Sequence, residues 1–145
     1  MVALTKDRAT PQKADGIKSG SVAAASLIYG GAIVMRDAAG NLVPGQTALN
    51  LIGIGRAEER VDNSTGAAGD LALRYRPGTF RYANSAAADE ITAADIGAVC
   101  YAVDDQTVAK TDGTLTRSPA GIIEDVDAQG VWVRFDEGLT KTAAA

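Results

Sequence analysis

Histidine is missing from the 145-residue sequence, and cysteine, tryptophan and phenylalanine are rare. Without imidazole, the chain lacks the usual general base, the usual zinc ligand and every serine or cysteine triad that depends on histidine. The single cysteine, Cys100, can form no disulfide within the chain, and its place in an apolar strand pattern predicts a small buried hydrophobe. An enzyme of this composition would need carboxylate or lysine chemistry.

The carboxylates offer little for such chemistry. Asp104 and Asp105 adjoin one predicted hairpin turn and the acids of residues 124–127 adjoin another, and acidic residues are favoured there because they accept hydrogen bonds from the local backbone. Residues 125–136 have the spacing of a calcium-binding loop. However, glutamine occupies one ligand position, aspartate replaces the final glutamate, and a strand pattern stands where a helix should begin. We predict no enzyme activity, no metal site and no cofactor.

Apolar runs long enough to span a membrane are also missing, and the N-terminus lacks the apolar core of a secretory signal. We therefore expect a soluble protein made in the cytoplasm. The net charge is −4 and the isoelectric point about 4.7. An acidic chain is a poor ligand for phosphate backbones, so direct binding of nucleic acid is not expected.

The charge is unevenly distributed along the chain. Residues 1–20 carry four basic and two acidic side chains, a balance of +2 that leaves −6 for the remainder. This segment is polar, contains Pro11 and has neither helical nor strand periodicity, which predicts an extended arm. A basic arm suits docking onto an acidic protein surface, with Lys6, Arg8 and Lys13 as candidate contacts, although an ordinary solvated tail has the same composition.

The chain length suits one domain with one core. We expect this domain to span residues 21–138 and residues 139–145 to form a flexible tail. Hydrophobic residues make up 46% of the sequence, but many of them are alanine. A core of that composition is thin, so contacts between subunits are an expected source of stability.

Short apolar blocks ended by turn residues predict a mainly β fold, a small single-domain β-barrel or sandwich of short antiparallel strands. A strand and a hairpin are expected within residues 21–43. A further strand is expected within 49–61, where two glycines mark a bend. One or two helical turns at most fit residues 84–97. Residues 97–137 show four strands in the order strand, tight turn, strand, loop, strand, tight turn, strand.

Residues 71–82 predict a β-hairpin, because the Pro-Gly pair at 77–78 suits a type II turn. One face of this hairpin would consist of Leu73, Tyr75, Phe80 and Tyr82. The other face would consist of Arg74, Arg76 and Arg81. Like charges across a strand pair are unfavourable unless an acidic group meets them, so this arginine face is a candidate contact surface. A solvated face is the alternative.

Trp132 is the only tryptophan, and in the predicted strand it faces the opposite side from Val131 and Val133. It could belong to a second core layer or anchor a subunit interface. We favour the interface, because tryptophan is enriched there.

Three segments in the last third of the chain carry a pattern of three different short motifs: G-x-V-x-Y-x-x-D-D over Gly97–Asp105, A-G-I-x-x-D over Ala120–Asp125, and G-V-x-V-x-F over Gly130–Phe135. This pattern resembles the capsid decoration (cement) proteins of tailed bacteriophages. The resemblance implies a structural virion protein on the outer capsid surface. It also implies that the major capsid protein is its partner, that it forms a homotrimer on the shell, and that it is made in the host bacterial cytoplasm.

A second interpretation comes from another functional class, a small β-barrel that binds a ligand or carbohydrate. It requires aromatic side chains gathered at the barrel mouth. The sequence has seven aromatic residues, and three of them fall within the predicted hairpin of residues 71–82. The composition therefore favours a structural role over a binding module.

Overall fold

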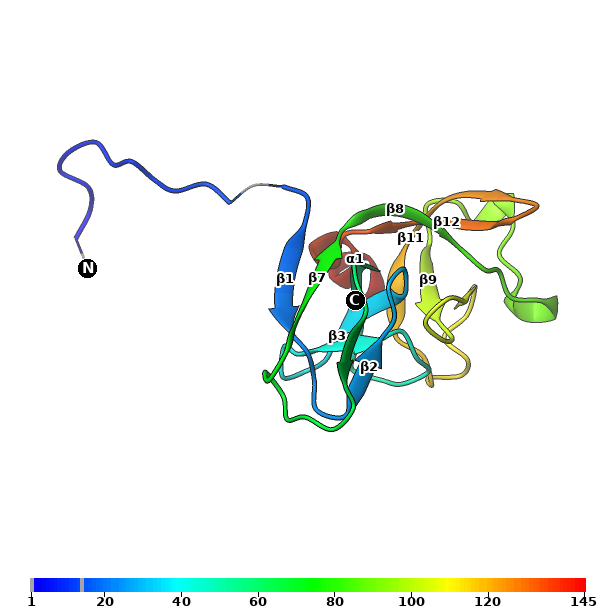
Figure 1. The fold of residues 1–145 in the computed structure, drawn as a ribbon. Helices are drawn as coiled ribbons and strands as arrows, with labels where there is room; N and C mark the ends of the chain where they lie inside the picture. The colour runs from blue at the N-terminus through cyan, green and yellow to red at the C-terminus, as the bar shows by residue number, and fades with distance from the viewer. Residues whose placement is uncertain (1, 14) are drawn as a thin grey trace.

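Two five-stranded sheets form the body of the protein in the computed structural model, which describes residues 2–13 and 15–145 (Figure 1). The first sheet has the order β1 (Lys18–Ser21), β7 (Ala72–Arg76), β5 (Ile52–Ala57), β3 (Ile33–Arg36) and β4 (Leu42–Pro44). The second has the order β10 (Val108–Ala109), β9 (Val99–Ala102), β11 (Pro119–Asp127), β12 (Gly130–Phe135) and β8 (Gly78–Tyr82). Neighbouring strands are antiparallel in both sheets.

The predicted mainly β class is confirmed, and the arrangement is that of a small sandwich. Neither sheet closes into a barrel in the described part of the chain. A separate two-stranded sheet joins β2 (Ser26–Ile28) to β6 (Val61–Asn63). The remaining elements are the 3-10 turns η1 (Ala87–Asp89) and η2 (Ala93–Asp95) and the C-terminal helix α1 (Glu137–Ala144).

Two hydrophobic clusters stabilise this arrangement, and strand β3 contributes to both. Ile33 and Met35 belong to the cluster between the two sheets, together with the inward side chains of β9, β11 and β12. Val34 points to the opposite face, where it joins a second cluster with residues of β2, β5 and β7. All three side chains are fully buried, because successive residues of a strand point to opposite faces and both faces of β3 are covered.

The predicted four strands of residues 97–137 are confirmed as β9, β10, β11 and β12, which are neighbours in the second sheet. A bulge interrupts the β11–β12 ladder between Ile123 and Asp125. Gly121 lies where strands meet closely, because a Cβ atom there would come within 2.5 Å of the Arg134 carbonyl oxygen. Short turns join β9 to β10 and β11 to β12, whereas β9 pairs with β11 across the loop of residues 110–118.

The hairpin predicted for residues 71–82 is wrong. Strand β7 pairs with β1 and β5 in the first sheet, whereas β8 pairs with β12 in the second. Pro77 therefore stands at a corner where the chain passes from one sheet to the other, and Gly78 has φ of 137°. Tyr75 joins the second cluster and Tyr82 the cluster between the sheets. Pairing each strand with a partner in its own layer buries both side chains, which an isolated hairpin would not do.

The two glycines of β5 allow close approach of other backbone segments. A Cβ atom on Gly53 would lie 1.9 Å from the Ala120 carbonyl oxygen, and one on Gly55 would lie 2.5 Å from the Arg76 carbonyl oxygen. The bend expected from these glycines is present as a bulge in the β3–β5 ladder. The bulge lies where the backbone of β5 is closely approached by the backbones of β11 and β7.

Two sequence predictions about turns are confirmed. The β3–β4 hairpin is closed by Asp37, whose carboxylate accepts hydrogen bonds from the backbone amides of Ala39 and Asn41. The helical content of residues 84–97 is limited to η1 and η2, and Thr92 and Asp95 form a capping box at η2.

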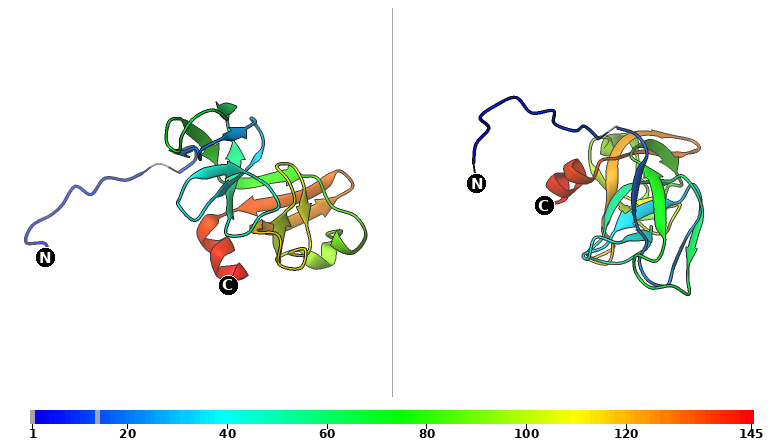
Figure 2. Two further views of the ribbon diagram at one scale, coloured as in Figure 1. Left: turned by 90° about the horizontal axis from the view of Figure 1, so that it is seen from below. Right: turned by 60° about the vertical axis from the view of Figure 1, so that its left-hand side comes forward.

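The two ends of the chain differ from each other. Residues 2–13 contain no strand or helix, and both views of Figure 2 show them extending away from the body. The body begins with β1 at Lys18, three residues before the expected boundary at Ser21. The flexible tail expected for residues 139–145 is instead part of α1, which packs against β11 and β5. Asp136 caps this helix by accepting a hydrogen bond from the Leu139 amide at 3.0 Å.

Candidate contact site

The arm, defined here as residues 2–13, is exposed along its whole length. Its charged side chains are Lys6, Asp7, Arg8 and Lys13, a balance of +2. None of the ion pairs in the described part of the chain involves Lys6, Arg8 or Lys13. The arm therefore presents three cations to solvent on an extended backbone, while the remainder of the chain carries −6.

The predicted arginine face is not one surface. Arg74 forms a salt bridge of 2.9 Å with Glu59, and Arg76 forms one of 3.0 Å with Glu58. Arg81 lies in the other sheet. The acidic partners that the sequence analysis required for two of these arginines are thus present, and they come from the turn after β5.

These ion pairs hold both carboxylates in the charged form. The guanidinium groups of Arg56 and Arg76 lower the pKa of Glu58 through hydrogen bonds of 2.8 and 3.0 Å. Arg74 lowers the pKa of Glu59 in the same way. The two carboxylates therefore offset two of the three guanidinium charges at this surface.

Arg81 and Trp132 form a second small surface, on the outer face of β8 and β12. The two residues are register partners, and the Arg81 guanidinium lies 5.6 Å from the centre of the Trp132 ring. The indole Nε1 donates a hydrogen bond of 2.9 Å to Asp127, and this bond is the main reason that the pKa of Asp127 is lowered. Arg81 also donates a hydrogen bond of 2.6 Å to Gln129. Trp132 is partly exposed, so it is not a core residue, and its orientation is fixed by its neighbours.

Cys100 is fully buried, as predicted. Burial raises the pKa of its thiol to about 12, and the sulfur approaches the Gly121 carbonyl oxygen at 3.6 Å. A thiol with so little thiolate character is a poor nucleophile at neutral pH. Among residues 2–13 and 15–145, no group of three or more acidic or cysteine side chains is arranged to hold a metal ion.

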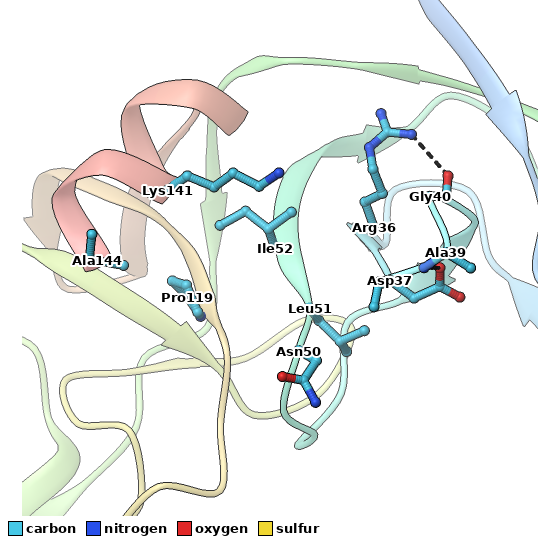
Figure 3. A pocket seen from close by; sticks show the side chains of 12 residues that line it. Arg36, Asp37, Ala39, Gly40, Asn50, Leu51, Ile52, Pro119, Lys141 and Ala144 are labelled. Carbon is cyan, nitrogen blue, oxygen red and sulfur yellow. Dashed lines mark hydrogen bonds between the residues drawn. The ribbon is translucent and has the colours of Figure 1, made fainter.

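Two open grooves flank helix α1, and neither was expected from the sequence. The first, named here the α1 groove, has a volume of about 550 Å³ and lies between α1 and the β3–β4 hairpin (Figure 3). Its floor is formed by Leu51, Ile52 and Pro119, and Lys141 and Arg36 lie at its sides. The second, of about 740 Å³, lies at the base of the arm and includes Lys18, Tyr75 and Asp136.

Both grooves depend on where α1 packs. The residues after β12 indicate the helix itself but not the surface against which it packs. The signal that was available is an N-cap aspartate followed by a glutamate in the first turn and a lysine in the last. The side chain of Glu137 then fixes the helix to the body through a 2.9 Å salt bridge with Arg36. Arg36 also donates hydrogen bonds to the Tyr75 hydroxyl and the Gly40 carbonyl oxygen.

The chain was compared with protein-family models, curated proteins and solved structures, and none of them matches it. No helix in the described residues combines the length and the apolar character needed to cross a membrane.

Proposed function

We propose that this chain is a structural virion protein that binds the outer surface of a tailed-phage capsid and stabilises contacts between major capsid subunits. The resemblance of the segments Gly97–Asp105, Ala120–Asp125 and Gly130–Phe135 to capsid decoration proteins motivates the proposal. The observation that carries it is the arm, whose three cations have no ion-pair partner in the described part of the chain.

The arm is suited to contact a surface outside its own body. Its backbone is extended and exposed, and its three cations would approach an acidic shell protein without first breaking an ion pair. Single contacts of this kind are weak, because exposed ion pairs contribute up to about 1 kcal/mol each. Attachment would gain strength from several subunits engaging the shell together, which raises the effective concentration of each arm.

The body has the properties expected of a scaffold in this role. Its carboxylates lie in turns or in ion pairs, its one thiol is buried, and its sheets present short strands rather than a deep cavity. The aromatic side chains favour this role over a carbohydrate-binding module, because they are not gathered on one surface. Tyr82 and Phe135 belong to the core between the sheets and Phe80 packs against them, while Tyr29 and Trp132 each lie beside a different arginine.

Co-sedimentation with capsids of its own phage that lack this protein tests the proposal. We expect saturable binding at a fixed ratio to the major capsid protein, and weaker binding as salt is raised, because screening acts on exposed charges. No binding at low salt would contradict the proposal. A glycan array probed with the same preparation then tests the carbohydrate-binding alternative.

The contribution of the arm is tested with a chain that lacks residues 2–13 and keeps β1 intact. We expect this variant to fold and to lose most of its capsid binding. The triple substitution Lys6→Gln, Arg8→Gln and Lys13→Gln is the matched control for charge, since it keeps the length of the arm. Binding by both variants at the level of the parent chain would remove the arm from the attachment site.

A further inference from the structure

Two loops that are linked through Ser118 present exposed leucine side chains. Leu115 is 74% exposed and Leu49 is 53% exposed. The Ser118 hydroxyl joins their loops, because it donates a hydrogen bond of 2.6 Å to the Ala48 carbonyl oxygen and accepts one of 3.1 Å from the Leu51 amide. Ser118 itself is buried. We name Leu49 and Leu115, with the loop residue Asp112, the leucine tip.

The backbone of the tip is held in an unfavourable conformation. Gly113, Thr114 and Leu115 have φ of 63°, 60° and 61°, in the left-handed region that side-chain-bearing residues rarely adopt. Such a conformation persists only where surrounding contacts enforce it, and it is concentrated at functional positions.

Contacts beneath the tip enforce its shape. The Asp112 carbonyl oxygen accepts hydrogen bonds from the amides of Thr116 and Arg117 at 3.0 and 2.9 Å. Arg117 in turn forms a salt bridge of 3.2 Å with Asp89, and the Thr111 hydroxyl donates to the same carboxylate. The loop is therefore rigid on its inner side, while its leucine points to solvent.

The α1 groove lies next to these loops in the sequence and shares their flanking residues. Asn50 and Leu51, which follow Leu49 directly, line the groove, and so does Pro119. The groove floor is apolar and unfilled, so it suits the side chain that the tip exposes. Neither Leu49 nor Leu115 lines the groove of its own chain, so a leucine of a second copy is a suitable occupant.

The charges at the two surfaces are also complementary. Lys141 on the side of the groove has a side chain that is 63% exposed. Its nearest acid, Glu137, lies at 4.0 Å and is already bound by Arg36 at 2.9 Å. In the described part of the chain, no ion pair or side-chain hydrogen bond involves the carboxylate of Asp112. A copy whose tip enters the groove would bring a carboxylate to this cation.

We infer that the chain associates with copies of itself by inserting the leucine tip of one copy into the α1 groove of another. The apolar contact supplies affinity, and the Asp112–Lys141 pair fixes the orientation. This contact is made between copies of the chain alone and does not depend on capsid attachment. Its failure and the failure of the proposed function are therefore separate results.

Sedimentation velocity of the full purified chain, up to roughly millimolar concentration, tests the inference. We expect concentration-dependent association that Leu115→Asp weakens roughly 10- to 100-fold, the loss expected when a leucine side chain no longer becomes buried. Leu71→Asp is the matched control, because Leu71 is 43% exposed at a distance in sequence from both surfaces. A chain that stays monomeric throughout, or an equal effect of both substitutions, would overturn the inference.

Charge reversal separates a direct contact from a change in folding. Asp112→Lys and Lys141→Glu should each weaken association several-fold, and the two together in one chain should restore it. A mixture of the Leu115→Asp and Lys141→Glu chains should associate better than either alone, since it contains one intact tip and one intact groove. Thermal unfolding of each variant checks that it is folded. Absence of both rescues, with folded variants, would also overturn the inference.

Discussion

The two ends of this chain both carry charged side chains, yet they differ in what those side chains contact. Helix α1 begins at an aspartate cap, buries the Thr140 side chain and binds Arg36 through Glu137. Among the residues that the structure describes, the arm has no comparable anchor to the body, and its three cations stay exposed. A charged terminal segment becomes part of a fold when its charges find partners there. When they do not, the segment remains available to another molecule.

Removing each end is the strongest test of this comparison. Deleting residues 137–145 should lower the free energy of unfolding by on the order of 2–4 kcal/mol, because it uncovers β5 and β11 and leaves Arg36 without its carboxylate. Deleting residues 2–13 should change it by less than about 0.5 kcal/mol. Urea unfolding followed by circular dichroism measures both. Equal effects of the two deletions would show that the ends do not differ in anchoring.

The cap of α1 gives a smaller effect. Asp136→Ala should destabilise the protein by about 1 kcal/mol, because the Leu139 amide loses its acceptor at the start of the helix. Asp136→Asn is the matched control, since asparagine can accept the same bond. If both substitutions cost the same amount, the carboxylate acts through its charge rather than as a cap.

The link between α1 and the β3–β4 hairpin is expected to contribute somewhat less. Glu137→Gln should lower the free energy of unfolding by about 0.5–1 kcal/mol, because the pair with Arg36 is partly exposed and Arg36 keeps its bonds to Tyr75 and Gly40. A double-mutant cycle with Arg36→Gln measures the coupling. A coupling energy near zero would show that the helix is held by packing alone.

Neutralising the arm should leave stability unchanged. The triple substitution at Lys6, Arg8 and Lys13 removes charges that have no ion-pair partner within the described chain, so the unfolding midpoint in urea should match that of the parent. A clear shift of the midpoint in either direction would mean that the arm contacts the body. The same preparation in the capsid-binding assay shows whether its charges act on a partner.

The grooves and the leucine tip illustrate why the candidate surfaces were only partly predictable. The exposed cations of the arm follow from composition, because no apolar residue pattern there could drive burial. The α1 groove does not, since its lining comes from β5, the β3–β4 turn, β11 and α1, which are far apart in sequence. The predicted contact residues Arg74 and Arg76 form ion pairs with Glu59 and Glu58. The pairing of neighbouring strands in a hairpin could not predict these partners, because they come from the turn after β5.

By itself, the sequence determined the strand class, the four strands β9–β12, the β3–β4 hairpin, the short helical turns within residues 84–97 and the burial of Cys100. These features depend on side-chain alternation and on turns between neighbours in the chain, where few alternative pairings compete. Only the tertiary structure decided that Pro77 is a corner between two sheets and that residues 137–144 form a docked helix. Both depend on partners distant in sequence, because each strand or helix buries its apolar or charged side chains against whichever layer can accept them.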